Sequence, residues 1–484
     1  MMMEKIETYC LQSRWQLEGS RLIYYGLRAK GGRLLKNEIR VSARRAAILS
    51  TLPRPLNDAE KKTLGELLGD AVVELSQQSQ TPASLQEARF CTTCAANDFI
   101  IPGLTFDANG ICPLCATAKD TDELCSVLPV KNHFPRASKS RFDVALFYTG
   151  GKDSTFLLYY LAKCLSLRVL AMTWEIPFLS ESAKQSIENA KKHFPNVEFI
   201  SRAVNAQELS AVYSALYQRT GNCCACPSLA YVLFYPEMVA NRVPYFVAGN
   251  EPVQMLGLYY NRMAPKFAYR FAKNKPLNLL LNVGRVLTLR PPLRSGQVHT
   301  LMTMKQLAYG DHPVKKMIGY RNELVENVVA ALHTRPLLLH PLKKAIRLSS
   351  RTGNIPAFVH VDLDVAAGGC YDWRKIRSTI VRECGWVAPD GEEKGLHTSC
   401  KIEKCKEYSQ FLRFYHMESR MIPFSALEIS LASRKNNLSR EQAIREMQTS
   451  LGFSLTEPAE CAFMKAFMDG AEASLSNRAV THGV

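Results

Sequence analysis

Four cysteines in the first quarter of the chain come as two CxxC pairs, and metal binding is the chemistry such pairs favour. Cys91 and Cys94 form the first pair, Cys112 and Cys115 the second, and 17 residues separate them. At this spacing two hairpins bring four thiolates onto one tetrahedral Zn²⁺, a closed site that is usually structural. It replaces the core that a module of about 30 residues is too small to build. An iron site and two unrelated pairs of buried thiols stay open as alternatives.

A glycine turn follows the apolar strand at 142–148 and precedes a helical stretch. Its sequence is TGGKDST, residues 149–155. The glycines let backbone N–H groups approach a phosphate, and the helix start adds a favourable dipole. We expect Ser154 to cap the helix and bind phosphate, Asp153 to bridge through Mg²⁺, and Lys152 to screen phosphate charge. The predicted loop residues are Thr149, Gly150, Gly151, Lys152, Asp153, Ser154 and Thr155. The spacing is not that of the Walker loop.

Three more cysteines lie within four residues, at 223–226. Cys223 and Cys226 form a CxxC pair at an expected helix start, where the helix dipole lowers thiol pKa. With Cys224, they suggest metal or iron–sulfur ligation or a persulfide-carrying thiol. Buried structural cysteines and a second zinc site are the alternatives. A cluster would need further ligands, and the sequence offers Cys370, Cys400 or Cys405.

Other candidate groups carry less signal. Glu251 follows a predicted strand and suits substrate or Mg²⁺ contact, against a solvated loop position. Asp362 and Asp364 are a paired-carboxylate candidate, although alternation in FVHVDLDV indicates an exposed strand face. His397 with Cys400 and Cys405 is a weaker metal candidate. Trp373 and Trp386 are expected in the core.

Strands and helices alternate around these residues. Strands are predicted at 142–148, 168–174, 197–204 and 245–250, and helices at 154–164, 180–193 and 228–242. This order predicts an α/β fold with a doubly wound parallel sheet and a ligand outside the carboxyl ends of its strands.

The flanking segments differ in composition. We divide the chain into an accessory α+β domain at 1–88, a zinc-ribbon-like module at 89–118, a linker at 119–140, the nucleotide domain at 141–255, a basic insert at 256–355 and a helical region at 356–484. Within 1–88, residues 15–25 are predicted as strand, and residues 57–77 as helix because leucines recur there at steps of three to four.

The turn TGGKDST resembles the SGGxDS signature of the PP-loop ATP pyrophosphatases, with Thr149 in place of the first serine. The resemblance implies the HUP-like form of the doubly wound sheet, with ATP held by its pyrophosphate end. It also implies adenylation of a carbonyl or similar oxygen, release of pyrophosphate, and displacement of AMP by nitrogen or sulfur. In that family the second strand end contacts adenine, which places Trp174 at the base pocket, although a core position suits it equally.

The order of motifs is similar to that of the N-acetyl sugar amidotransferases of surface-polysaccharide biosynthesis. The matching segments cover roughly 89–255 and 370–450: CTTCAANDFIIPGLTFDANGICPLC, FDVALFYTGGKDST, AMTWEIPF, CCAC, GNE, YDWRKIRSTIVRECGW, HTSCKIEKCKEY and LSREQAIREM. This resemblance implies conversion of a sugar acetamido group to an acetamidino group. Ammonia would come from a separate glutaminase subunit.

Two other functions stay open. Zinc ribbons, PP-loops and paired cysteines also occur in tRNA thiolation enzymes, where the cysteines hold an iron–sulfur cluster or a persulfide. A basic chain suits tRNA, whose binding is dominated by phosphate neutralisation. A non-catalytic nucleotide-binding scaffold is the third reading, against which the intact GGKDS argues.

Charge narrows the range of partners. The chain has 484 residues, 47% hydrophobic and 22% charged, which excludes a disordered or collagen-like chain. Its net charge is +17, and residues 251–351 hold 17 Lys and Arg against 4 acidic residues. We therefore expect a phosphate-bearing acceptor (nucleotide sugar, lipid-linked glycan or tRNA), with a solvated basic face as the plainer reading. A cytoplasmic protein is expected, because no apolar run approaches about 18 residues and no signal segment is visible.

Overall fold

The computed structural model describes residues 7–121, 126–221, 226–264, 275–310, 322–389, 400–449 and 451–470. At its centre is a parallel five-stranded sheet in the order β11-β10-β9-β12-β13. The strands are β9 (Val144–Phe147), β10 (Val169–Glu175), β11 (Glu198–Ala203), β12 (Tyr245–Ala248) and β13 (Ala357–Phe358). The predicted mixed α/β fold with a parallel sheet is confirmed.

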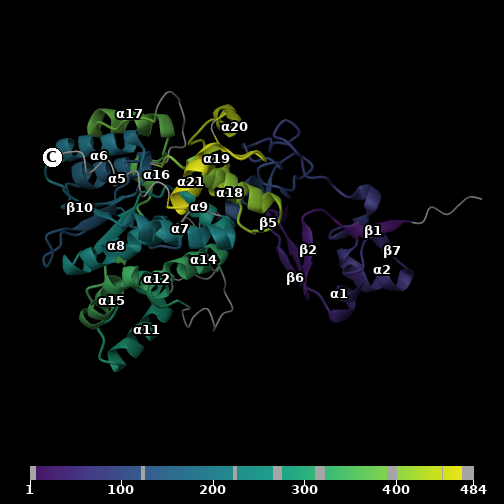
Figure 1. Cartoon of the computed structure of the whole chain (residues 1–484), viewed down its shortest axis with the longest axis horizontal. Helices are drawn as coiled ribbons and strands as arrows, with labels where there is room; N and C mark the ends of the chain where they lie inside the picture. Colours follow the sequence, from purple (N-terminus) through teal and green to yellow (C-terminus); the bar gives the residue numbers. More distant parts are fainter. Residues whose placement is uncertain are drawn as a thin grey trace, which may run out of the picture.

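Helices cover both faces of this sheet (Figure 1), because each strand points alternate side chains into two different cores. Val144 and Leu146 enter one core, and Ala145 enters the other. On the first face lie α5 (Lys152–Tyr159), which continues as a π-helical turn η4 (Tyr160–Cys164), α6 (Glu181–His193) and α17 (Trp373–Cys384). On the second face lie α7 (Ala206–Thr220), α8 (Cys226–Ala240), α12 (Gln297–Tyr309), α14 (Glu323–Leu332), η5 (Pro336–Leu339) and α15 (His340–Thr352).

The remaining helices of the described chain follow or flank these layers. They are α3 (Pro113–Ala116), α4 (Ala118–Thr121), α9 (Pro252–Tyr260), α11 (Lys275–Leu287), α16 (Leu363–Ala366), α18 (Glu403–Tyr415), α19 (Phe424–Arg434), α20 (Arg440–Thr449) and α21 (Glu460–Met468). Helix α19 packs against α9 and α20, which brings the C-terminal region onto the carboxyl end of β12. Within the described residues, no helix is both long and apolar enough to cross a membrane.

The N-terminal elements lie to one side of the sheet and have a core of their own (Figure 1). They are β1 (Thr8–Leu11), β2 (Trp15–Glu18), β3 (Arg21–Tyr24), β4 (Ala29–Lys30), β5 (Arg33–Leu34), β6 (Glu38–Arg40), α1 (Ala43–Leu49), β7 (Arg54–Pro55), α2 (Asp58–Leu64), η1 (Gly65–Leu67), β8 (Val72–Glu74) and η2 (Leu75–Gln77). Buried Arg14 donates to the carbonyls of Phe414 and Tyr415, which fastens this part to α18.

Two predicted elements are wrong in extent. The helix expected over 57–77 ends at Leu64, because Gly65 has φ +53° and breaks it, and Val72–Glu74 is a strand paired with β1. The strand read in FVHVDLDV is only β13. Asp362 instead accepts hydrogen bonds from the backbone N–H groups of Asp364 and Val365 and caps α16.

Candidate functional site

The carboxyl ends of β9 and β12 lie side by side at the centre of the sheet. Strand order continues from β9 to β10 and β11 on one side, and to β12 and β13 on the other. Phe147 and Ala248, at the ends of β9 and β12, are paired in register. In doubly wound sheets such a switch point leaves a crevice for ligand. The TGGKDST turn follows β9, and Gly249, Asn250 and Glu251 follow β12, so both predicted segments meet there.

The glycine turn is closely packed from two directions. Gly150 has φ +73°, and a Cβ there would lie 2.5 Å from the carbonyl oxygen of Ala183. A Cβ on Gly249 would lie 2.5 Å from the backbone nitrogen of Ser154. The indole Nε1 of Trp386 donates to the Gly150 carbonyl at 3.0 Å. Only glycine fits at these two positions, and the loop shape is therefore set by the backbone itself.

The helix after the turn begins earlier than predicted. Gly151, not Ser154, is the N-cap of α5, and the Ser154 hydroxyl lies 3.2 Å from that of Thr149 and 3.2 Å from the Gly151 carbonyl oxygen. The cap expected at Ser154 is wrong because the helix already includes Lys152. The first backbone N–H groups of α5, from Lys152 and Asp153, have no acceptor within the helix and face the turn. They are the groups that can receive an anion.

Three buried or half-buried carboxylates meet beside this turn. Oxygen atoms of Asp153, Glu251 and Glu428 all lie within 4.8 Å of one another. Asp153 comes from the start of α5, Glu251 from the N-cap of α9, and Glu428 from α19. Glu251 has no exposed surface, and Glu428 is half-buried.

Lys152 enters this cluster rather than the phosphate side of the turn. Its Nζ is 3.1 Å from Asp153 Oδ1 and 3.8 Å from Glu251 Oε1, and the side chain is 2% exposed. The ammonium also lies 4.1 Å from the centre of the Trp373 ring and 5.0 Å from that of Tyr371. Its charge is therefore held by two carboxylates and two aromatic faces.

Each carboxylate has its own donor. Tyr371 OH donates to Asp153 Oδ1 at 2.7 Å, and Trp373 Nε1 to Glu251 Oε2 at 2.8 Å. Gln254 Nε2 donates to Glu428 Oε1 at 2.9 Å. Glu251 Oε1 is buried and accepts no hydrogen bond from the described residues. Fixed donors of this kind orient the carboxylates, as outer groups do around metal ligands.

The cluster carries more negative than positive charge when fully ionised. Three carboxylates and one ammonium leave two negative charges in a space with little water. Burial raises the pKa of Glu251 to about 7, with a further rise from Asp153 and an opposing effect of Lys152. Burial, Glu251 and Asp153 raise the pKa of Glu428 well above its usual range. For Lys152, burial lowers the pKa, but Asp153 and Glu251 outweigh it and the net shift is upward.

A divalent cation fits this donor set. Carboxylate oxygens are the ligands that Mg²⁺ prefers, and two positive charges would balance the cluster. The hydrogen-bond-free oxygen of Glu251 supplies a ligand position. Bound here, Mg²⁺ would stand beside the anion-receiving start of α5.

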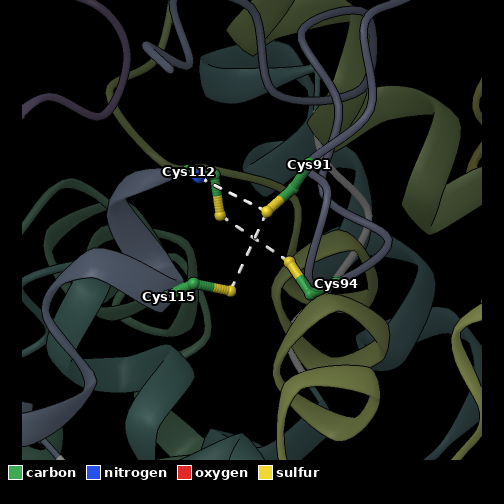
Figure 2. A group of neighbouring side chains, drawn as sticks. All are labelled: Cys91, Cys94, Cys112 and Cys115. Atoms are coloured by element: carbon green, nitrogen blue, oxygen red, sulfur yellow. Dashed lines mark hydrogen bonds between the residues drawn. The ribbon is translucent and has the colours of Figure 1, made fainter. Parts of the chain in front are cut away.

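The four predicted zinc ligands form a second group able to hold a metal ion (Figure 2). The Sγ atoms of Cys94 and Cys112 are 3.6 Å apart, and those of Cys91 and Cys115 are 3.9 Å apart. A tetrahedral Zn²⁺ with Zn–S bonds of about 2.3 Å requires sulfurs about 3.8 Å apart. The distances are far too long for disulfides and suit one shared ion.

Backbone N–H groups donate hydrogen bonds to two of these sulfurs, which favours the thiolate form that binds a metal ion. The N–H groups of Thr93 and Cys112 donate to Cys91 Sγ at 3.4 and 3.3 Å, and that of Ala96 donates to Cys94 Sγ at 3.4 Å. Hydrogen bonds from the other three thiols lower the pKa of Cys91. The expected turn between the pairs is present, with Asp107 accepting from the N–H groups of Asn109 and Ile111.

The cysteine module is joined to the C-terminal helices. Arg440, the first residue of α20, donates from Nη2 to the Cys91 carbonyl at 2.8 Å and from Nε to the Cys94 carbonyl at 3.2 Å. The module also shares the core that contains β9, α5 and α19. A metal ion bound by the four cysteines would therefore stabilise the packing of the C-terminal helices, including α19, which carries Glu428.

The other predicted site residues are scattered. Trp174, the last residue but one of β10, packs against the second core, and its buried Nε1 has no hydrogen bond to the described residues. Cys226 begins α8 with Sγ 2.7 Å from Tyr213 OH. Cys223, Cys224 and His397 lie outside the described residues. Asp364 pairs with Lys435 and accepts from the Tyr371 N–H, which makes it structural.

The further cysteines do not assemble a third site in the part of the chain that is described. Cys370 is exposed near Asn437, while Cys400 is partly buried and Cys405 is buried. The two groups of metal-capable side chains found among the described residues are the four thiols and the three carboxylates. Ligation of an iron–sulfur cluster by Cys226 with these cysteines therefore remains a prediction.

Sequence reasoning missed Glu428 and the donors Tyr371 and Trp373. Glu428 stands in an unremarkable helix, 275 positions after Asp153, and no spacing connects the two. Trp373, expected as a core aromatic, is buried at 2% exposure but also donates to Glu251. The YDW run at 371–373 was part of the family-like C-terminal block and was the one available signal.

No family model matches the chain, and a search of curated proteins finds no match either.

Proposed function

We propose that the chain is an ATP-dependent, pyrophosphate-releasing enzyme of the PP-loop type. The observation that carries this proposal is the meeting of an anion-receiving glycine turn and a buried carboxylate cluster at one switch point of a parallel sheet. A phosphate chain and its divalent cation need both parts, side by side. The intact GGKDS turn, with the carboxylate cluster beside it, argues against a non-catalytic scaffold.

Different residues of the chain bind the nucleotide, hold the metal ion and orient the carboxylates. The N–H groups at the start of α5 receive the pyrophosphate end of ATP, and Trp174 lines the base pocket. Asp153, Glu251 and Glu428 hold Mg²⁺, which supplies charge neutralisation when pyrophosphate departs. Lys152 keeps Asp153 and Glu251 together, and Tyr371 and Trp373 hold their orientation. The four-cysteine module with Zn²⁺ stabilises the C-terminal helices α19 and α20 beside the site.

For the acceptor, we propose an N-acetyl sugar and amidotransfer. The acetamido oxygen attacks the α-phosphorus of ATP, the α–β bond breaks, and pyrophosphate leaves. Ammonia from a partner glutaminase then bonds to the activated carbon, and AMP leaves with the oxygen. The order of the motifs, in which the four-cysteine group precedes the glycine turn and the C-terminal block follows, supports this choice. Thiolation of tRNA is the second candidate; it depends on Cys223 and Cys226, of which Cys226 lies within the described residues.

Pyrophosphate release tests the catalytic part of the proposal. Purified protein would be given ATP, Mg²⁺, ammonium and a panel of UDP-N-acetyl sugars. Removing the charge in Asp153→Asn or Glu251→Gln is expected to lower pyrophosphate release by about a hundredfold or more. Glu383→Gln is the matched control, because Glu383 lies near the end of α17, outside the carboxylate cluster, and pairs with Lys163. Unchanged turnover in the Asp153 variant would contradict the assignment.

The donor and acceptor are separated in the same assay. Turnover with ammonium and a sugar nucleotide supports amidotransfer, with a product one mass unit lighter than the substrate because NH replaces O. Turnover that needs tRNA and a sulfur donor, and that ceases in Cys226→Ser, would favour thiolation instead.

A further inference from the structure

Helix α11 presents its apolar side to solvent. Five large apolar residues occupy one stripe of the helix at relative positions 0, 1, 4, 7 and 8, which an α-helix places on one face. Their exposed fractions are 67% for Leu279, 69% for Leu280, 48% for Val283, 56% for Val286 and 79% for Leu287. Leu289, just beyond the helix end, is 96% exposed.

The other side of the helix carries Leu281, which packs against the second core, and two polar residues that bond to the following loop. Asn282 donates from Nδ2 to the Leu293 carbonyl at 3.0 Å and accepts from the Leu293 N–H at 2.8 Å. Arg285 Nε donates to the Pro291 carbonyl at 2.9 Å. Surface helices of globular proteins normally turn their apolar stripe inward. Here two polar residues hold the helix with that stripe outward.

A contiguous stripe differs from scattered exposed leucines. Single apolar residues on a surface are ordinary, but a continuous apolar patch marks an interaction site. Helix α11 lies at the lower margin of the molecule in Figure 1, away from the N-terminal elements. The helix therefore lies at the periphery of the molecule, and the side chains of its stripe are exposed.

The charged residues in the described segments of this region are mostly basic. Residues 275–310 contain five Lys and Arg and no acidic residue, and residues 340–352 contain four and none. Lys305 of α12 lies close enough to Arg285 and Arg290 for their charges to interact, and α12 packs against α15. Burial and these two arginines lower the pKa of Lys305. Arg290, Lys344 and Arg347 are exposed.

Apolar stripe and positive charge together select one kind of partner. A second copy of this chain would bring a basic surface against a basic surface, and a nucleic acid would leave the leucines in water. An anionic lipid surface accepts both, because acyl chains take up the leucines and headgroups pair with the cations.

We propose that α11 docks the protein on anionic membrane surfaces, with the stripe of Leu279, Leu280, Val283, Val286 and Leu287 entering the lipid interface. The helix has 13 residues and is about 20 Å long, so it lies in the plane of the interface and does not cross the bilayer. The inference does not depend on the proposed function, since none of these residues belongs to the ATP site.

Vesicle co-sedimentation tests the proposal with the full chain. One set of vesicles is pure phosphatidylcholine, and the other is an equimolar mixture with phosphatidylglycerol. We expect binding to the mixed vesicles that weakens as salt rises. The double change Leu280→Gln and Leu287→Gln is expected to lower the partition coefficient more than about tenfold. Arg290→Gln alone is expected to lower it about fivefold.

Matched controls keep the result interpretable. Leu75→Gln with Leu455→Gln changes two leucines that are 51% and 40% exposed on other parts of the surface, and binding should persist. Gln keeps nearly the helix propensity of Leu, so circular dichroism should be unchanged in the α11 variant. A Leu287→Trp reporter should shift to shorter emission wavelength with mixed vesicles, and a Leu75→Trp reporter should not.

Three results would overturn the proposal. Equal binding to pure phosphatidylcholine would remove the role of charge. Equal loss in the control pair would remove the role of α11. Absence of vesicle binding, together with a dimer in sedimentation velocity that Leu280→Gln and Leu287→Gln abolish, would assign the stripe to a second copy of the chain.

Discussion

Replacing Glu251 by glutamine should remove a pH-dependent cost from the folded state. Glu251 has no exposed surface, and its pKa is raised from 4.5 to about 7. Because the pKa is higher in the folded than in the unfolded chain, the folded chain binds more protons between these values. The free energy of unfolding therefore falls as pH rises through this window. Below pH 4.5 the cost is absent, and above pH 7 it is complete.

The magnitude follows from the shift. A change of 2.5 pKa units at about 1.36 kcal/mol each corresponds to about 3 kcal/mol lost by the wild-type chain between pH 4.5 and pH 7. Glutamine is neutral and nearly isosteric, and its side-chain carbonyl can still accept from Trp373 Nε1. At pH 8 without added Mg²⁺, we expect Glu251→Gln to be about 3 kcal/mol more stable than the wild-type chain. Mg²⁺ should narrow this difference by stabilising the wild-type chain more.

Urea unfolding at several pH values between 5 and 8 measures the difference. The buffers are freed of metal by a chelating resin without a soluble chelator, so that the cysteine-bound metal is kept. Glu383→Gln is the control, because hydrogen bonds from Lys163 and Arg382 lower the pKa of Glu383 to about 2. The contribution of Glu383 to the free energy of unfolding is lost only as pH falls below about 4.5. Between pH 5 and 8, the free energy of unfolding of Glu383→Gln should therefore change with pH as that of the wild-type chain does. If the free energy of unfolding of Glu251→Gln also changes with pH as that of the wild-type chain does, the raised pKa of Glu251 is refuted.

Two further changes probe the framework of the site. Cys94→Ser should lower the metal content measured by plasma mass spectrometry from about one ion per chain toward zero and expose the α20 region to proteolysis, because the Arg440 contacts lose their fixed carbonyls. A normal metal content would contradict the four-thiol site. Gly150→Ala should cost about 2 kcal/mol or more and lower pyrophosphate release, since its Cβ would meet the Ala183 carbonyl at 2.5 Å. Gly31→Ala is its control, with φ +56° but open space around the new Cβ, so an equal melting-temperature loss in both would show that the close contact is unimportant.

The proposed membrane docking gives the basic segment a different use from the one expected. From the sequence, the basic residues of this segment predict a binding site for a phosphate-bearing acceptor. Among the described residues, Arg285, Arg290 and Lys305 lie close to one another at α11, whose apolar stripe is exposed. A phosphate-bearing acceptor and an anionic membrane would both pair with the cations, but only the membrane would also bury the leucines of α11.

Local sequence patterns determined the parts of this protein that depend on neighbouring residues. The four parallel strands between 144 and 248, the cysteine pairs and the glycine turn all stand where they were predicted. Strand alternation, turn residues and CxxC hairpins depend on backbone geometry over a few positions, which the sequence displays directly. The helix predicted over 57–77 is wrong because its regularly spaced apolar residues belong to three different elements: a helix, a 3₁₀ turn and a strand.

Tertiary structure decided the composition of the carboxylate cluster and the direction of α11. Asp153 was recognised by its motif, but Glu428 and Tyr371 reach it only because α19 and the segment before α17 pack on the sheet. The amphipathic pattern of α11 can be seen in its sequence, yet the pattern alone predicts an inward apolar face. Asn282 and Arg285 reverse that orientation through bonds to carbonyl groups of the following loop. Such long-range pairings follow from the packing of the whole chain, and no spacing in the sequence records them.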